Sequence, residues 1–133
     1  MSTTPDGTPR SKILIADDNP QILELLEAYL EPLNVQVRLA GDGETALDAV
    51  ERDQPDLILL DIMMPKRSGF EVCRILKDDP RYRDIPIIMV TALNEAGDME
   101  RARECGGDDF LTKPVNKIEL LARVRDMLKL GGA

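Results

Sequence analysis

Apolar residues gather along the chain in five short runs that contain few polar positions. The runs read KILIA, VQVRLA, DLILL, PIIMV and DFLT, and most of them are continuously apolar rather than alternating. A strand covered on both faces of a parallel sheet gives such a continuous run, whereas a half-exposed strand alternates between apolar and polar residues. The pattern therefore predicts five strands of a parallel sheet, at residues 12–16, 35–40, 56–60, 86–90 and 109–112.

The longer segments between these runs are amphipathic, which favours helices. The first segment has apolar residues at helical spacing, namely Ile22, Leu25, Leu26, Tyr29 and Leu33. Asn19 can cap this helix, and Pro20 suits its first position because the N–H that proline lacks would have no partner there. We therefore expect a helix directly after the first strand.

Two later helices begin at recognisable caps. Ser68 and Glu71 have the spacing of a capping box. The last helix is expected over residues 117–130, with Asn116 as its cap and Glu119 three residues further on. The order is therefore strand then helix, five times over. Right-handed crossovers fold such a chain into a doubly wound, three-layer α/β domain.

The length of 133 residues suits one domain, which we place at residues 12–130. Residues 1–11 are small, polar and proline-bearing and are expected to form a disordered N-terminal tail. Residues 131–133 are expected to be a C-terminal tail or the start of a linker. The first residues lack the apolar core of a signal peptide, and no apolar stretch approaches the roughly 20 residues of a membrane helix. We expect a cytoplasmic protein with no membrane contact.

Composition excludes several classes of site. A net charge of −8 repels nucleic acid and anionic lipid, so neither is expected as a direct partner. The absence of histidine excludes a Ser-His-Asp triad, a Cys-His dyad, any histidine-ligated metal and any phosphohistidine within this sequence. Cys73 and Cys105 have no metal-like spacing. They are expected to be buried thiols, although a disulfide between them stays open in principle.

Polar residues follow four of the five apolar runs. They are Asp17-Asp18 after the first, Asp61 after the third, Thr91-Ala92 after the fourth and Thr112-Lys113-Pro114 after the fifth. In a parallel sheet the carboxyl ends of the strands share one edge, and ligands bind there. The fold is therefore expected to assemble three carboxylates, a hydroxyl and an ammonium group at that edge.

Each of these residues has an ordinary explanation when it is taken alone. An aspartate after a strand commonly forms a turn or caps a helix, and a lone lysine is commonly a solvated surface charge. Three carboxylates packed together repel one another, raise one another's pKa and need a cation. Oxygen ligands on a small site suit Mg²⁺, which favours one or two carboxylates together with phosphate oxygens. Lys113 cannot bind a metal, but it can neutralise a phosphoryl group.

With its motifs in this order, the chain resembles the response-regulator receiver domain of two-component signalling over about residues 12–130. The residues that carry the resemblance are Asp17-Asp18, Asp61 with Met64-Pro65 and Gly69, Thr91-Ala92, and Lys113-Pro114. The resemblance implies a flavodoxin-like parallel sheet with strand order 2-1-3-4-5.

The resemblance also implies an acceptor and a metal site. Asp61 would be the phosphoacceptor, since a carboxylate can act as a nucleophile and form an acyl phosphate. Asp17, Asp18 and Asp61 would hold Mg²⁺ or Mn²⁺, together with the backbone carbonyl of Met63. A metal-dependent phosphatase with an aspartate nucleophile is disfavoured, because the second acid expected two residues after the nucleophile is Met63 here.

Further roles follow from the same resemblance. Lys113 would pair with the phosphoryl oxygens, Thr91 would donate its hydroxyl to one of them, and Ala92 would leave the phosphoryl group room. Thr91 and Phe110 would form the switch. The Lys113–Pro114 peptide bond is expected to be cis.

The implied donor is a sensor histidine kinase or a histidine phosphotransfer protein. The implied readout is the face formed by the fourth helix, fifth strand and last helix, which would contact an output domain or a second copy of the chain. We expect a phosphoacceptor domain rather than an enzyme, although it would catalyse its own phosphotransfer and a slow autodephosphorylation. A phosphorelay intermediate and a phosphorylation-independent adaptor remain as alternatives.

Overall fold

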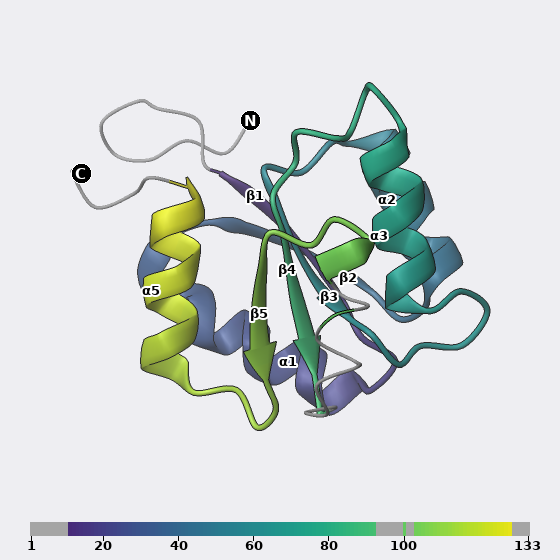
Figure 1. Ribbon diagram of the computed structural model, residues 1–133. Coiled ribbons are helices and arrows are strands. Elements are labelled where there is room, and N and C mark those ends of the chain that lie inside the picture. The colour runs from purple at the N-terminus through teal and green to yellow at the C-terminus, as the bar shows by residue number, and fades with distance from the viewer. Residues whose placement is uncertain (1–10, 93–99, 101–102, 129–133) are drawn as a thin grey trace.

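The computed structural model of the chain describes residues 11–92, 100 and 103–128 (Figure 1). Five parallel strands form one sheet in the order β2-β1-β3-β4-β5. The strands are β1 (Lys12–Ala16), β2 (Gln36–Ala40), β3 (Leu57–Asp61), β4 (Ile87–Thr91) and β5 (Asp109–Thr112). The predicted fold and strand order are confirmed, and every strand lies within one residue of its predicted position.

Helices follow the strands at the predicted places. They are α1 (Pro20–Leu30), with a 3-10 turn η1 (Glu31–Leu33), α2 (Gly43–Arg52), α3 (Gly69–Asp78) and α5 (Lys117–Leu128). The side chains of Asn19, Ser68 and Asn116 each accept a backbone N–H from the first turn of the helix that they precede. The described part of the chain contains no helix long and apolar enough to cross a membrane.

Four predicted segments fall wholly or partly outside the described residues. Both predicted tails do so, apart from Ser11, and so do residues 129 and 130 of the last predicted helix. Most of the fourth predicted helix also lies there, although Glu100, Arg103 and Glu104 are helical.

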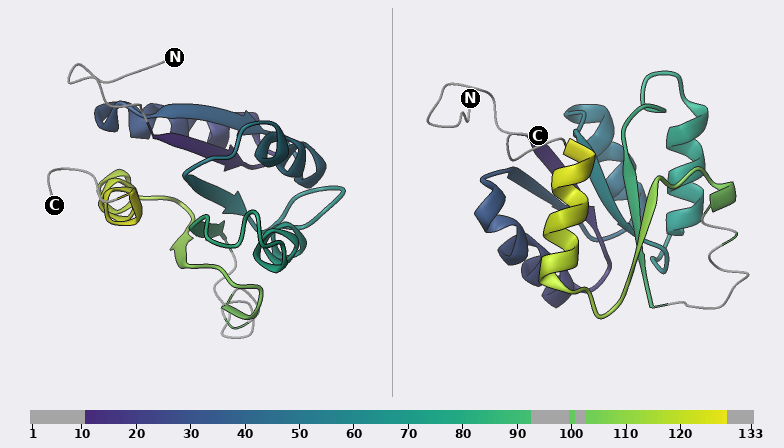
Figure 2. Two further views of the ribbon diagram at one scale, coloured as in Figure 1. Left: turned by 90° about the horizontal axis from the view of Figure 1, so that it is seen from above. Right: turned by 60° about the vertical axis from the view of Figure 1, so that its left-hand side comes forward.

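The helices cover the two faces of the sheet in pairs, which makes three layers (Figure 2). One core lies between the sheet and the pair α1 and α5, where Leu26 and Leu120 are buried against strand residues such as Ile15. The other core lies between the sheet and the pair α2 and α3, where Val50 and Val72 are buried. Both faces of the central strands are therefore buried, which explains why the sequences of these strands are continuously apolar.

Candidate functional site

The strands bring the predicted polar residues to one edge of the sheet. Asp61 and Thr91 are the last residues of β3 and β4, and Asp17 directly follows β1. Thr91 lies opposite Thr112 of β5 in the register, so the following residue, Lys113, leaves the sheet at the same edge. Figure 1 shows this edge at the arrowheads of β4 and β5.

Three carboxylates meet at this edge. Asp17, Asp18 and Asp61 each offer one oxygen, and these oxygens lie within 4.8 Å of one another. Asp17 and Asp61 are buried, with exposed fractions of 1% and 3%, whereas Asp18 is exposed. Among the described residues this is the one group of three or more acidic, cysteine or histidine side chains so arranged. An all-oxygen donor set that opens to solvent on one side fits a hard cation such as Mg²⁺, which keeps several waters.

Lys113 supplies the positive charge next to these carboxylates. Its ammonium nitrogen lies 2.8 Å from Asp17 Oδ2 and 3.5 Å from Asp61 Oδ1. Burial alone would lower the pKa of Lys113, but the hydrogen bond to Asp17 and the charges of both aspartates outweigh burial and raise it. Lys113 is therefore a permanent cation at neutral pH.

Asp61 holds its charge less readily than an ordinary aspartate. Burial and, next in weight, the charge of Asp17 raise its pKa from 3.8 to about 6, and Lys113 offsets only part of that rise. The backbone N–H of Met63 donates to Asp61 Oδ1 over a long 3.4 Å. A cation placed at the cluster would favour the ionised form of Asp61.

Asp17 serves the turn after β1 and the site at once. Its Oδ1 accepts the backbone N–H of Asn19 at 2.9 Å, and its Oδ2 accepts the Lys113 ammonium. The backbone N–H of Asp17 donates to the carbonyl of Ala40 in β2 at 3.0 Å. Asp17 therefore both stabilises the turn after β1 and pairs with the Lys113 ammonium.

The chain leaves β3 in a tight path that requires glycine at position 69. The N–H of Gly69 donates to the carbonyl of Ile62 at 2.9 Å, and a Cβ on Gly69 would overlap the carbonyl oxygen of Asp61. Met63 lies in the intervening loop with an exposed fraction of 61%, and its side chain is therefore open to solvent beside Asp61.

The same loop is tied to the start of α2, which the sequence did not indicate. The ammonium of Lys66 lies 3.6 Å from Asp42, and the Arg67 guanidinium lies 2.9 Å from Glu44. Lys66 also adopts a positive φ of 68°. These contacts join segments far apart in the chain, and each residue alone looks like an ordinary surface charge.

The remaining site residues lie on or beside β4 and β5. Thr91 is buried, and its carbonyl accepts the backbone N–H of Lys113 at 2.8 Å. Ala92 is exposed at the end of β4. The Lys113–Pro114 peptide bond is cis. Phe110 is half-buried and packs against the core on the α2 and α3 side of the sheet.

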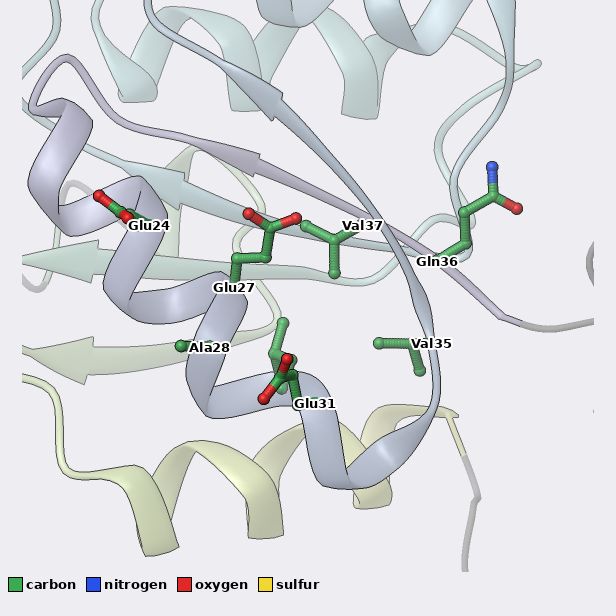
Figure 3. A pocket seen from close by; sticks show the side chains of 8 residues that line it. Glu24, Glu27, Ala28, Glu31, Val35, Gln36 and Val37 are labelled. Carbon is green, nitrogen blue, oxygen red and sulfur yellow. The ribbon is translucent and has the colours of Figure 1, made fainter.

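A hollow of about 390 Å³ lies away from this cluster, between α1 and β2 (Figure 3). Glu24, Glu27 and Glu31 of the α1–η1 segment line it, opposite Val35 and Val37. In Figure 3 the Glu27 side chain extends from α1 toward Val37 of β2. Its size does not make it the site, because its carboxylates do not converge as those of the aspartate cluster do.

The fold and the cluster define a class of protein. It is a flavodoxin-like α/β domain with a cluster of carboxylates, suited to binding a cation, at the carboxyl ends of its strands. The chain belongs to the response regulator receiver domain family, whose model matches residues 13–125. The resemblance found in the sequence is therefore confirmed.

Relatives of several kinds share this domain. The response regulator PleD of Caulobacter vibrioides is 49% identical over 90% of this chain and 26% of its own length. The DNA-binding dual master transcriptional regulator RpaA of Synechocystis is 45% identical over 89% of this chain and 49% of its own length. The chain thus spans about a quarter to a half of these relatives.

A solved structure bears directly on the metal. The receiver domain of a sensor histidine kinase from Pseudomonas aeruginosa, with a magnesium ion coordinated in its active-site cleft, matches with a TM-score of 0.84 and 32% identity. The match covers 92% of this chain and 100% of that chain. The acidic cluster described above fits a magnesium site of that kind.

Proposed function

We propose that this domain accepts a phosphoryl group on Asp61 in a Mg²⁺-dependent reaction. The observation that carries the proposal is the buried Asp61 carboxylate, which lies beside a second buried carboxylate, Asp17, with the ammonium of Lys113 in contact with both. Two acids and one lysine at strand ends form a site that attracts a cation and then a phosphoryl group.

The transfer step uses the ionised form of Asp61. One of its carboxylate oxygens attacks the phosphorus atom of a donor phosphohistidine, and the phosphorus–nitrogen bond breaks with its electron pair left on the imidazole ring. The product is an acyl phosphate. Lys113 neutralises charge on the phosphoryl oxygens, while the Thr91 hydroxyl and the Ala92 backbone N–H donate to them. In a loose transition state such positioning and neutralisation are the main contributions of a protein.

Asp17, Asp18, Asp61 and the backbone carbonyl of Met63 would hold the metal ion. When bound, Mg²⁺ supplies positive charge next to the phosphoryl oxygens and beside the aspartates. Mn²⁺ prefers similar oxygen ligands and is expected to substitute for it.

The phosphoryl donor lies outside this sequence, which contains no histidine. A sensor histidine kinase or a histidine phosphotransfer protein is the donor that we infer, and the cytoplasm is where we expect the transfer to occur. The readout would be the face of the fourth helix, β5 and α5. Ile118 of α5 is 80% exposed, which leaves an apolar side chain available to an output domain or a second copy.

A phosphorelay intermediate is the second candidate. The favouring observation is that solved structures similar to this chain include receiver domains of sensor histidine kinases from Syntrophus aciditrophicus and Pseudomonas aeruginosa. An intermediate would return its phosphoryl group to a histidine phosphotransfer protein, whereas a terminal regulator would retain it. An adaptor that binds partners without phosphorylation would do neither.

The test is phosphorylation of the purified chain with acetyl phosphate and Mg²⁺, followed by intact-mass measurement. We expect one added phosphoryl group in the parent and none in Asp61→Asn. Asp56→Asn is the matched control, because Asp56 immediately precedes β3 while Asp61 ends it. Equal phosphorylation of Asp61→Asn and the parent would overturn the proposal.

A further inference from the structure

The only two cysteines of the chain meet in the folded protein. Cys73 lies on α3, and Cys105 lies 32 residues later, shortly before β5. The Cys73 thiol donates to the backbone carbonyl of Cys105 at 3.3 Å. Both side chains belong to the same buried core, on the α2 and α3 side of the sheet.

The two thiols differ in access. Cys73 is fully buried, with an exposed fraction of 0%, whereas Cys105 retains 5%. Cys105 lines an open groove of about 200 Å³, together with Phe70, Arg74 and Glu104. A small reagent that enters the groove therefore reaches Cys105 first, and Cys73 lies behind it.

The pKa values of the two thiols also differ, and the more accessible thiol has the lower one. The hydrogen bond with Cys73 lowers the pKa of Cys105 to about 7, and the nearby Arg74 guanidinium contributes in the same direction. The hydrogen bond with Cys105, followed by burial, raises the pKa of Cys73. The accessible thiol is thus the one that more readily forms a thiolate, which is the reactive form.

We propose that Cys73 and Cys105 form an oxidation site at which a hydroperoxide converts the two thiols into one reversible disulfide. The Cys105 thiolate attacks one peroxide oxygen, the O–O bond breaks, and a sulfenic acid and hydroxide result. The Cys73 thiol then attacks the sulfenic sulfur, its proton leaves with the hydroxyl as water, and the S–S bond forms. Overall, two thiols and one H₂O₂ give one disulfide and two waters.

The disulfide would join α3 to the segment that leads into β5. That strand is followed by Lys113, whose ammonium contacts the aspartate cluster. The oxidation site is separate from the phosphoacceptor site and does not depend on it. A cross-link between these two elements restricts their relative movement.

The test starts from the fully reduced chain, treated with a small excess of H₂O₂ at neutral pH and then digested with trypsin without reduction. We expect the intact mass to fall by about 2 Da, for two hydrogens lost, and dithiothreitol to reverse the change. The linked peptides would be residues 68–74 and 104–117. No mass change, oxidation confined to the methionines, or disulfides only between copies of the chain would each overturn the proposal.

Single variants separate the two roles. In Cys73→Ser, Cys105 should stop at the sulfenic acid, seen as a gain of about 16 Da that dimedone traps. In Cys105→Ser, Cys73 should resist both peroxide and alkylation in the folded protein. Cys73→Ala and Cys105→Ala repeat the test if a serine variant fails to fold, as judged by circular dichroism. If Cys105 in Cys73→Ser and Cys73 in Cys105→Ser reacted equally with peroxide, the assigned order of attack would be wrong.

Discussion

The Lys113 ammonium donates a 2.8 Å hydrogen bond to Asp17, across 96 residues of sequence. Its distance to Asp61 is longer, at 3.5 Å. In the unphosphorylated domain Lys113 therefore neutralises the buried carboxylate of Asp17 first and that of Asp61 second. A phosphoryl group on Asp61 would compete with Asp17 for the same ammonium.

Replacing Lys113 by methionine should weaken both the fold and the phosphotransfer. Two buried carboxylates would lose their cation, at a cost of about 1–3 kcal/mol in the free energy of unfolding. Loss of one charge-stabilising donor should slow phosphorylation by on the order of 10²-fold. Urea unfolding and time-resolved intact mass with acetyl phosphate measure the two effects. Lys117→Met, an exposed lysine at the start of α5, is the control and should change neither.

Asp61→Asn should stabilise the metal-free domain at neutral pH. The pKa of Asp61 rises from 3.8 to about 6 on folding, so between these pH values the folded state binds the additional proton. Stability therefore falls as the pH rises through this window, and the penalty is complete above about pH 6. The asparagine carries no charge and avoids this penalty, which is on the order of 1–3 kcal/mol.

Urea unfolding with EDTA at pH 4 and pH 7.5 measures this difference. The stabilisation by Asp61→Asn should be large at pH 7.5 and small at pH 4. Glu27→Gln, an exposed carboxylate on α1, should have little effect at either pH. An equal effect of Asp61→Asn at both pH values would show that the raised pKa is not its cause.

Mg²⁺ binding should weaken as the pH falls below 6. Asp61 must be ionised to bind the metal, and at pH 5.5 only about a quarter of it would be, given the pKa of about 6. The apparent dissociation constant should therefore increase about fourfold from pH 7.5 to pH 5.5. Isothermal titration calorimetry measures it. In Asp61→Asn the remaining affinity should be lower and should lose most of this pH dependence.

Phosphorylation should reorganise the edge formed by β4 and β5. The added charge of about −1.5 to −2 would attract the Thr91 hydroxyl, and Phe110 would rotate inward. A complete reversal of populations from 1:99 to 99:1 needs roughly 5.5 kcal/mol, and a few charge-assisted hydrogen bonds would supply part of it. Amide NMR shifts over residues 91–128 should change when beryllofluoride, a phosphoryl mimic, is added. Shifts that change only next to Asp61 would contradict the switch.

The phosphorylated state should be long-lived for this family. Hydrolysis needs a water in line with the bond to Asp61. Met63 and Leu93 are the side chains expected to flank that approach, and neither can orient a water by hydrogen bonding. Met63 is 61% exposed beside the site, whereas Leu93 lies outside the described residues.

Replacing Met63 by asparagine and Leu93 by glutamate together should therefore speed the loss of phosphate. The decay is followed by intact mass after removal of the donor. Met64→Leu, which alters a partly buried neighbour on the core side of the loop, should leave the rate unchanged. A double variant that decays no faster than the parent would show that these side chains do not set the lifetime.

The strands and the edge that carries the site could be predicted from the sequence because their physical signals are local. Continuous apolar runs mark buried parallel strands, and the topology then places every strand end together. Asp61 could therefore be grouped with Asp17 and Lys113 although the three are far apart in the chain. The family resemblance added roles that the pattern alone did not give.

Contacts that depend on packing could not be predicted. The ion pairs of Lys66 with Asp42 and of Arg67 with Glu44 join the loop after β3 to the start of α2, and each residue alone is an ordinary surface charge. The Lys113 ammonium lies closer to Asp17 than to Asp61, at 2.8 Å against 3.5 Å, and the sequence does not indicate so small a difference in distance. The meeting of Cys73 with Cys105 likewise depends on how α3 packs against the segment that leads into β5, which no local spacing reveals.

The separation of 96 positions between Asp17 and Lys113 also bears on when the aspartate cluster gains its cation during synthesis of the chain. A growing chain that has left the ribosome only as far as β4 already has all three aspartates but no ammonium group to neutralise them. In such a partial chain the carboxylates would repel one another, with no Lys113 to offset the repulsion. The cluster therefore gains its neutralising lysine only after the last strand of the sheet has been made, so the charge balance of this edge is among the last features of the domain to form.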